Sequence, residues 1–224
     1  MKNLKSVVIG LILVTVFLLV FQKPLLYSYY TFNSVEIEVK YKSVPLLNSN
    51  NIETSAESEF VQYESVSDDT FVKLPHKTDI ITIKTETAKS SVYQLQTCFE
   101  KNGYYCFVFS CMLRHFPYNA KTHRGDMLVV VDENGNEKHR YKSDNDEWVL
   151  DYENDTVLIY NSKKNSFNSI NATNTQVEKS LEFDCDGYNR VIINYLDYDN
   201  YVWQVLFYRD NDLICKKTAS AFNA

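Results

Sequence analysis

Two hydrophobic patterns divide the chain near residue 31. Residues 6–21 carry no charged side chain and are mostly apolar, whereas residues 34–42 alternate between apolar and polar side chains. An uncharged run of this kind is typical of a membrane-associated helix, and alternation with a period of two predicts a strand with one buried face. The sequence therefore predicts an N-terminal hydrophobic helix within residues 1–30, followed by a separate domain over residues 31–218.

The N-terminal run has the features of a signal anchor. Lys2 and Lys5 precede it, and Lys23 follows it. A helix over this run rises only ~24 Å, somewhat short of a ~30 Å hydrocarbon core, but Leu4 lengthens it and the Lys23 side chain can reach the far interface. We therefore expect the helix to cross a membrane once.

The residues after the run bear on cleavage and orientation. Residues 21–26 lack the pair of small residues that a signal peptidase recognises, which favours an uncleaved anchor; secretion after cleavage is the alternative. Lysines precede the helix, and the segment after it is acidic. The N-terminus is therefore expected in the cytoplasm and the C-terminal domain outside it.

Short β-rich runs recur through the rest of the chain. Residues 43–59, rich in Asn, Ser and Glu, follow neither a helical nor a strand period and are expected to form a flexible loop or tether. Strands are predicted over residues 34–42, 60–63, 71–74, 80–85, 92–99, 104–113, 127–131, 137–141, 148–152, 156–161, 167–171, 177–184, 190–196, 201–208 and 212–218. Residues 219–224 are interpreted as a tail.

The spacing of these strands predicts the architecture. Consecutive strands joined by short links form an antiparallel meander. An extracytoplasmic all-β domain with this many strands is expected to be a sandwich or a barrel. A small propeller-like arrangement is the alternative, because residues 148–171 have the rhythm of a blade, although no residue signature recurs at a blade length.

The charge of the domain excludes one class of partner. Removing the three lysines of residues 1–23 from the 23 basic residues leaves 20 against 29 acidic residues, a formal charge of −9. A domain this acidic is repelled by nucleic acid and by an anionic bilayer surface. The expected partners are the membrane, through the N-terminal helix, and a protein or cell-surface ligand.

Cys98 and Cys106 are a candidate disulfide. They flank the turn at residues 101–103, and a three-residue loop there would set them opposite each other at a separation that a disulfide can bridge. A two-residue turn would instead place Cys98 opposite Phe107 and exclude the bridge. Both alternatives stay open at this point.

The other three cysteines are Cys111, Cys185 and Cys215. Cys111 is expected to be a buried apolar residue on the strand over residues 104–113. Cys185 and Cys215 lie in the last meander and could pair with each other. Because the number of cysteines is odd, one must stay unpaired in any scheme within one chain.

Two sets of residues suggest metal sites, and strand geometry argues against both. The first set consists of three acidic pairs, Asp184 with Asp186, Asp197 with Asp199, and Asp210 with Asp212. Successive turns of a meander lie at opposite ends of a sheet, and Asp is an ordinary turn residue. The second set is Cys106, Cys111, His115 and His123. Its two cysteines point to opposite faces of one strand. No metal or cofactor is therefore predicted.

A four-residue motif resembles an enzyme family. Leu95-Gln96-Thr97-Cys98 is similar to the Leu-x-Thr-Cys core of the sortases, which are N-terminally anchored cysteine transpeptidases. The resemblance implies Cys98 as the nucleophile, with a His and an Arg as partners, for which His76 and Arg114 are available. Sortases place this cysteine near the end of the chain, whereas more than a hundred residues follow it here.

The hydrolase motifs that we considered do not occur in the sequence, and no catalytic residue is assigned. There is no Gly-x-Ser-x-Gly, no Ser-x-x-Lys and no His-Glu-x-x-His. The anchor, the tether and the aromatic-rich strands favour a non-catalytic binding, sensing, inhibitor or immunity module. The alternative is an exported enzyme, a hydrolase or transpeptidase, with an unrecognised active site.

Overall fold

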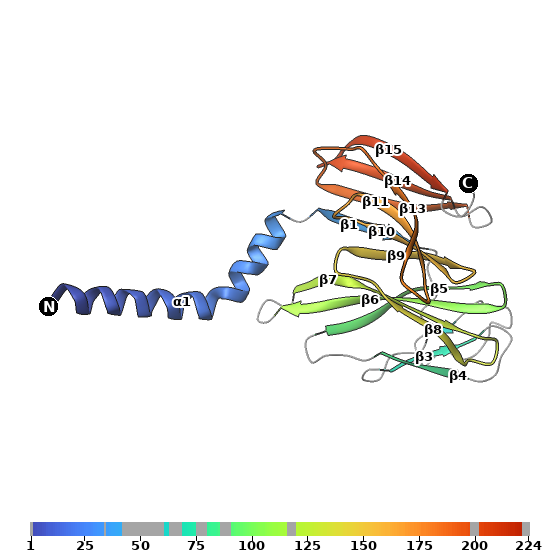
Figure 1. Ribbon diagram of the computed structural model, residues 1–224, viewed down its shortest axis with the longest axis horizontal. Coiled ribbons are helices and arrows are strands. Elements are labelled where there is room, and N and C mark those ends of the chain that lie inside the picture. Colours follow the sequence, from blue (N-terminus) through green and yellow to red (C-terminus); the bar gives the residue numbers. More distant parts are fainter. Residues whose placement is uncertain are drawn as a thin grey trace. The chain divides into compact units, whose positions relative to one another are not determined.

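The computed structural model describes residues 2–33, 35–41, 61–62, 69–74, 80–85, 91–115, 120–197 and 202–220. The chain divides into two units, Met1–Glu36 and Ile37–Ala224. The first unit is essentially one helix, and the second is built of strands (Figure 1). The predicted tether over residues 43–59 lies outside the described residues.

The helix α1 spans Lys2–Asn33 (Figure 1). Within it, Lys5–Gln22 is long and apolar enough to cross a membrane, and none of this stretch is buried inside the protein. Pro24 lies inside the helix, where its missing N–H interrupts the hydrogen-bond ladder, and α1 bends along its length. The predicted N-terminal apolar helix is therefore confirmed, with the length and composition of an anchor or a signal sequence.

The described strands of the second unit form four antiparallel sheets (Figure 1). The first sheet contains β2 (Val61–Gln62), β3 (Asp69–Lys73) and β4 (Ile80–Lys84). The second contains β5 (Ser91–Lys101), β6 (Tyr104–His115), β7 (Ala120–Val131) and β8 (Glu137–Lys142). The third contains β9 (Glu147–Glu153), β10 (Thr156–Asn161), β11 (Ser166–Asn171) and β12 (Val177–Glu182). The fourth contains β13 (Arg190–Asp197), β14 (Val202–Arg209) and β15 (Asp212–Ser220), with β1 (Glu36–Lys40) paired beside β13.

Three hydrophobic layers join these sheets in chain order. Val72 of the first sheet packs with Phe107 of the second, and Val108 of the second packs with Ile159 of the third. The last layer, around the fully buried Trp203, lies between the third and fourth sheets. The middle sheets are thus covered on both faces. This explains why most of β6 and residues 127–131 of β7 are nearly continuous apolar runs rather than an alternation.

The all-β prediction is confirmed, and the stacked antiparallel sheets are those of a sandwich with several layers. The described strands form no closed barrel. Three of the sheets are made of consecutive strands, and the fourth combines β13, β14 and β15 with β1 from the N-terminal side. The last strand ends at Ser220, two residues beyond the predicted domain boundary at residue 218.

The turn between β5 and β6 excludes the candidate disulfide between Cys98 and Cys106. Asn102 and Gly103 both have positive φ, 52° and 78°, and form a two-residue turn that pairs Lys101 with Tyr104. This register sets Cys98 opposite Phe107, with the Cys98 side chain between the first and second sheets.

The Cys106 side chain points to the other face of the second sheet, into the layer that joins it to the third. Of the two alternatives left open, the two-residue turn is therefore the one present, and it excludes the candidate Cys98–Cys106 bridge, which required a three-residue loop and two side chains on one face.

Candidate functional site

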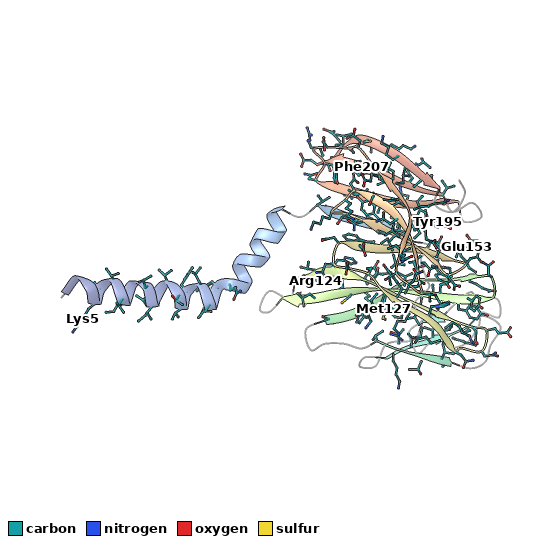
Figure 2. All side chains as sticks on the ribbon, in the orientation of Figure 1. Lys5, Arg124, Met127, Glu153, Tyr195 and Phe207 are labelled. Atoms are coloured by element: carbon teal, nitrogen blue, oxygen red, sulfur yellow. The ribbon has the colours of Figure 1, made fainter. Side chains whose placement is uncertain are left out.

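Among the described residues, two clusters of buried polar side chains join neighbouring sheets, and these are the places where chemistry could be concentrated. The lysine cluster consists of Lys101, Asp151, Tyr152 and Tyr195. The aspartate cluster consists of Ser110, His123, Asp126 and Ser143. Figure 2 shows the side chains of the β unit and labels Tyr195 of the first cluster.

The lysine cluster joins three sheets through one carboxylate. Lys101 ends β5, and its Nζ donates to Asp151 Oδ1 at 2.5 Å; the Lys101 and Asp151 side chains are only 10% and 2% exposed. The Tyr152 backbone N–H donates to the same oxygen at 2.7 Å, and the Tyr195 hydroxyl donates to Oδ2 at 3.2 Å. Asp151 therefore accepts from the second, third and fourth sheets.

Burial controls the protonation of this cluster. Loss of water lowers the pKa of Lys101 and raises the pKa of Asp151, and the attraction between the two opposes both shifts. The Cys106 thiol lies near enough for both charges to act on it, and burial, followed by the Asp151 charge, raises its pKa far above the ordinary value. Cys106 is therefore a protonated thiol and not a nucleophile at neutral pH.

The aspartate cluster is built around a carboxylate with 2% of its residue surface exposed. Asp126 Oδ1 accepts from Ser110 Oγ at 2.9 Å and from His123 Nε2 at 2.7 Å, while Oδ2 accepts from the Val149 N–H at 2.7 Å. The Asp126 N–H donates to Ser143 Oγ at 2.7 Å. The Val149 bond crosses to the third sheet, so this cluster also ties neighbouring sheets together.

The order of groups differs from that of a nucleophilic triad. A triad requires the serine hydroxyl to donate to the imidazole, with the carboxylate on the far side of the ring. Here Ser110 donates to Asp126 itself, and the Gly125 N–H donates to His123 Nδ1 at 3.4 Å, which leaves the proton on Nε2. The imidazole also stacks on Trp148, with ring centroids 4.2 Å apart. His123 therefore packs as a structural side chain between the second and third sheets.

The sortase resemblance is tested by Cys98, whose side chain is the only one of the three that the structure describes. Cys98 is only 8% exposed and packs in the hydrophobic layer between the first and second sheets, where a thiol is shielded from substrate. His76 lies outside the described residues, and Arg114 belongs to β6. The burial of Cys98 argues against a nucleophilic role.

The acidic pairs considered as a metal site do not come together among the described residues. Asp210 exchanges two hydrogen bonds with Asn189, at 2.7 and 2.8 Å, which is the chemistry of a turn. Asp184 and Asp212 are exposed, and Asp199 lies outside the described residues. In the part of the chain that the structure describes, no three or more His, Cys, Asp or Glu side chains are grouped to hold a metal ion.

The buried charges themselves were missed from the sequence. Asp151 interrupts the apolar run of β9, and Asp126 directly precedes the apolar run of β7. An acid inside an apolar strand signals a buried, paired carboxylate, because an unpaired one would be too costly to bury. The identity of its partner could not be read in this way, since Lys101 is 50 residues from Asp151 in the chain.

Comparisons with known proteins give no family for this chain. Neither a protein-family model nor a curated protein matches it. Among solved structures, it is similar to apo AztD from Citrobacter koseri, with 11% identity and a TM-score of 0.28 over 70% of this chain and 58% of that one. The chain thus spans less than two thirds of that relative's length, and a likeness at this level informs neither fold nor function.

Proposed function

We propose that the protein is a single-pass, membrane-anchored module whose β domain lies outside the cytoplasm and binds a polypeptide ligand. The observation that carries the proposal is the stretch Lys5–Gln22, whose apolar side chains are all left uncovered by the protein. Exposing this much apolar surface to water is unfavourable, and a lipid environment removes the cost. The lysines that precede the stretch favour a cytoplasmic N-terminus.

The buried clusters support binding over catalysis. Asp151 and Asp126 each accept three hydrogen bonds or ion pairs, and each carboxylate has at least one donor from a neighbouring sheet. Their carboxylates act as internal connectors that hold the stack together. A rigid stack of sheets presents a fixed surface to a partner, which lowers the entropic cost of binding.

The edge strand β12 is the surface best suited to a polypeptide ligand. All six of its residues are exposed, with Val177 at 58% and Leu181 at 46%, and among the described strands it pairs with β11 alone. The outer side of such a strand offers backbone N–H and C=O groups to an added strand. Lys179 and its acidic neighbours hinder edge-to-edge pairing with a second copy. We therefore favour an extended segment of another protein as the ligand.

Membrane fractionation of the full-length chain tests the anchor. Alkaline carbonate should leave the protein in the membrane pellet, whereas the variant L13R/F17R should move to the soluble fraction, because each arginine costs about 2.5–3.5 kcal/mol at the centre of a span. The matched variant V177R/L181R adds the same charges to β12 and should remain in the membrane. Release of the unaltered chain with an N-terminus at or after Gln22 would instead show a cleaved signal.

Photo-crosslinking in cells tests the edge. A photoreactive residue at position 177 or 181 should give a discrete adduct, and the same residue at Leu213 of β15, which is 50% exposed, should not. The adduct formed from position 177 should disappear in the L181R background. Equal labelling from all three positions would contradict binding at β12.

A further inference from the structure

Cys185 and Cys215 bring two thiols near each other at the surface of the fourth sheet. Cys185 lies in the connection between β12 and β13, and Cys215 lies on β15. The two thiols are near enough to act on each other electrostatically, both are partly exposed, and both pack against the hydrophobic layer between the third and fourth sheets. Neighbouring thiols with access to solvent meet the first requirement for oxidation to a disulfide.

Phe207 holds the two cysteines in place. It pairs with Cys215 in the register between β14 and β15. Its ring also contacts those of Phe183 and Tyr188, with centroids 6.1 and 4.9 Å apart, and these residues flank Cys185 in sequence. The connection and the strand thus pack on one aromatic ring.

Further hydrogen bonds fix the connection at both ends. The Phe183 N–H donates to the Asn165 carbonyl at 2.9 Å, and Asn165 Nδ2 donates back to the Phe183 carbonyl at 2.7 Å. On the other side, Arg209 Nε donates to the Gly187 carbonyl at 2.7 Å. The position of Cys185 beside Cys215 is therefore set by its surroundings and not by the interaction of the two thiols alone.

We propose that Cys185 and Cys215 are a disulfide-forming pair that closes when the domain meets a disulfide oxidant. One thiolate attacks a sulfur of an external disulfide, such as oxidised glutathione or an oxidoreductase disulfide, and releases one thiol. The second cysteine then attacks the protein sulfur of this mixed disulfide, and the other half of the oxidant leaves as its thiol. The protein loses two electrons and two protons, and the oxidant becomes two thiols. Closure in the cell rests on the proposed extracytoplasmic location.

The bond would link the connection that follows β12 of the third sheet to the edge strand β15 of the fourth sheet. It would close a loop from residue 185 to residue 215, which restricts the unfolded chain and is expected to raise Tm by roughly 10 °C. Burial, followed by the neighbouring Cys215 thiol, raises the pKa of Cys185 to about 11. The Cys185 thiolate is therefore scarce at pH 7.

The test uses the reduced full-length chain in detergent, equilibrated with a glutathione buffer and mapped by mass spectrometry without reduction. A peptide linking Cys185 to Cys215, together with the rise in Tm, is the expected result. The variants C185S and C215S should each lose the rise, whereas C111S, which removes a partly buried cysteine of β6, should keep it. The mapping needs no variant, so a misfolded mutant does not compromise it.

Two outcomes would overturn the pair. Both thiols could remain open to alkylation after equilibration in excess oxidised glutathione, or they could link to other cysteines. Trapping thiols in intact cells separates this inference from the proposed function. A pair that closes in the purified protein but stays reduced in cells would keep the disulfide assignment and count against the extracytoplasmic location.

Discussion

Removing the charge of Lys101 should destabilise the domain strongly. In K101M, Asp151 would keep its place between three sheets, 2% exposed, without the ammonium group that now lies 2.5 Å away. Breaking a buried ion pair by removing one partner costs about 3–5 kcal/mol, because the remaining charge is left uncompensated. For a domain of this size, the expected fall in Tm is roughly 10 °C or more.

The second substitution makes the argument specific. The double variant K101M/D151N replaces the carboxylate by a neutral amide that can still accept from the Tyr152 N–H and the Tyr195 hydroxyl. It should recover much of the lost stability, since no charge remains buried. The control K138M removes an exposed lysine from its ion pair with Asp132 and should leave Tm nearly unchanged.

The pH dependence of K101M gives an independent check. Burial already raises the pKa of Asp151 above its ordinary value of 3.8, and loss of the lysine should raise it further. A carboxyl whose folded pKa is raised binds its proton more readily in the folded state, so the folded chain gains stability as pH falls through that window. The stability gap between K101M and the unaltered protein should therefore narrow on acidification.

Thermal and urea unfolding of the full-length chains, both followed by far-UV circular dichroism at several pH values, measure all three effects. The reasoning would be refuted if K101M were as stable as the unaltered protein at pH 7. It would equally fail if the double variant were less stable than K101M, because the cost would then come from lost packing, including the contact of Lys101 with the Phe99 ring, and not from an unpaired charge.

Two further substitutions test the local geometry, each by the same unfolding measurement. Gly125→Ala should lower the free energy of unfolding several times more than Gly103→Ala. Gly125 has φ of 92°, and its added Cβ would lie 2.6 Å from the Asp144 carbonyl oxygen, whereas the added Cβ at Gly103 would face open space. Equal losses of stability would contradict this packing. Ser110→Ala removes one hydrogen bond to the buried Asp126 carboxylate and should lower the free energy of unfolding by about 1.5–3 kcal/mol. An unchanged free energy of unfolding would show that this hydrogen bond does not stabilise the domain.

The sequence was informative where a local period controls the structure. The apolar run of α1, the alternation at β1 and the turns between strands are all local patterns, and each predicted element is present within the described residues. The double burial of β6 could also be read from its continuous apolar run. These features depend on neighbours in sequence, which is why they were predictable.

What remained unpredictable depends on register and on contacts between distant segments. The choice between a two- and a three-residue turn at Asn102 moved Cys106 to the opposite face from Cys98, and both turns suit the same residues. The partner of Asp151 is 50 residues away, and Tyr195 reaches it from a different sheet. Such pairings follow from the order of the stacked sheets, which local pattern does not encode.

The location of the β domain is tested most directly by protease treatment of intact spheroplasts that express the full-length chain. If the chain is anchored by Lys5–Gln22 with its N-terminus in the cytoplasm, added protease should destroy the C-terminal domain while a cytoplasmic marker protein survives. Protection of the domain in intact spheroplasts, followed by its digestion after lysis, would place it in the cytoplasm and contradict the account.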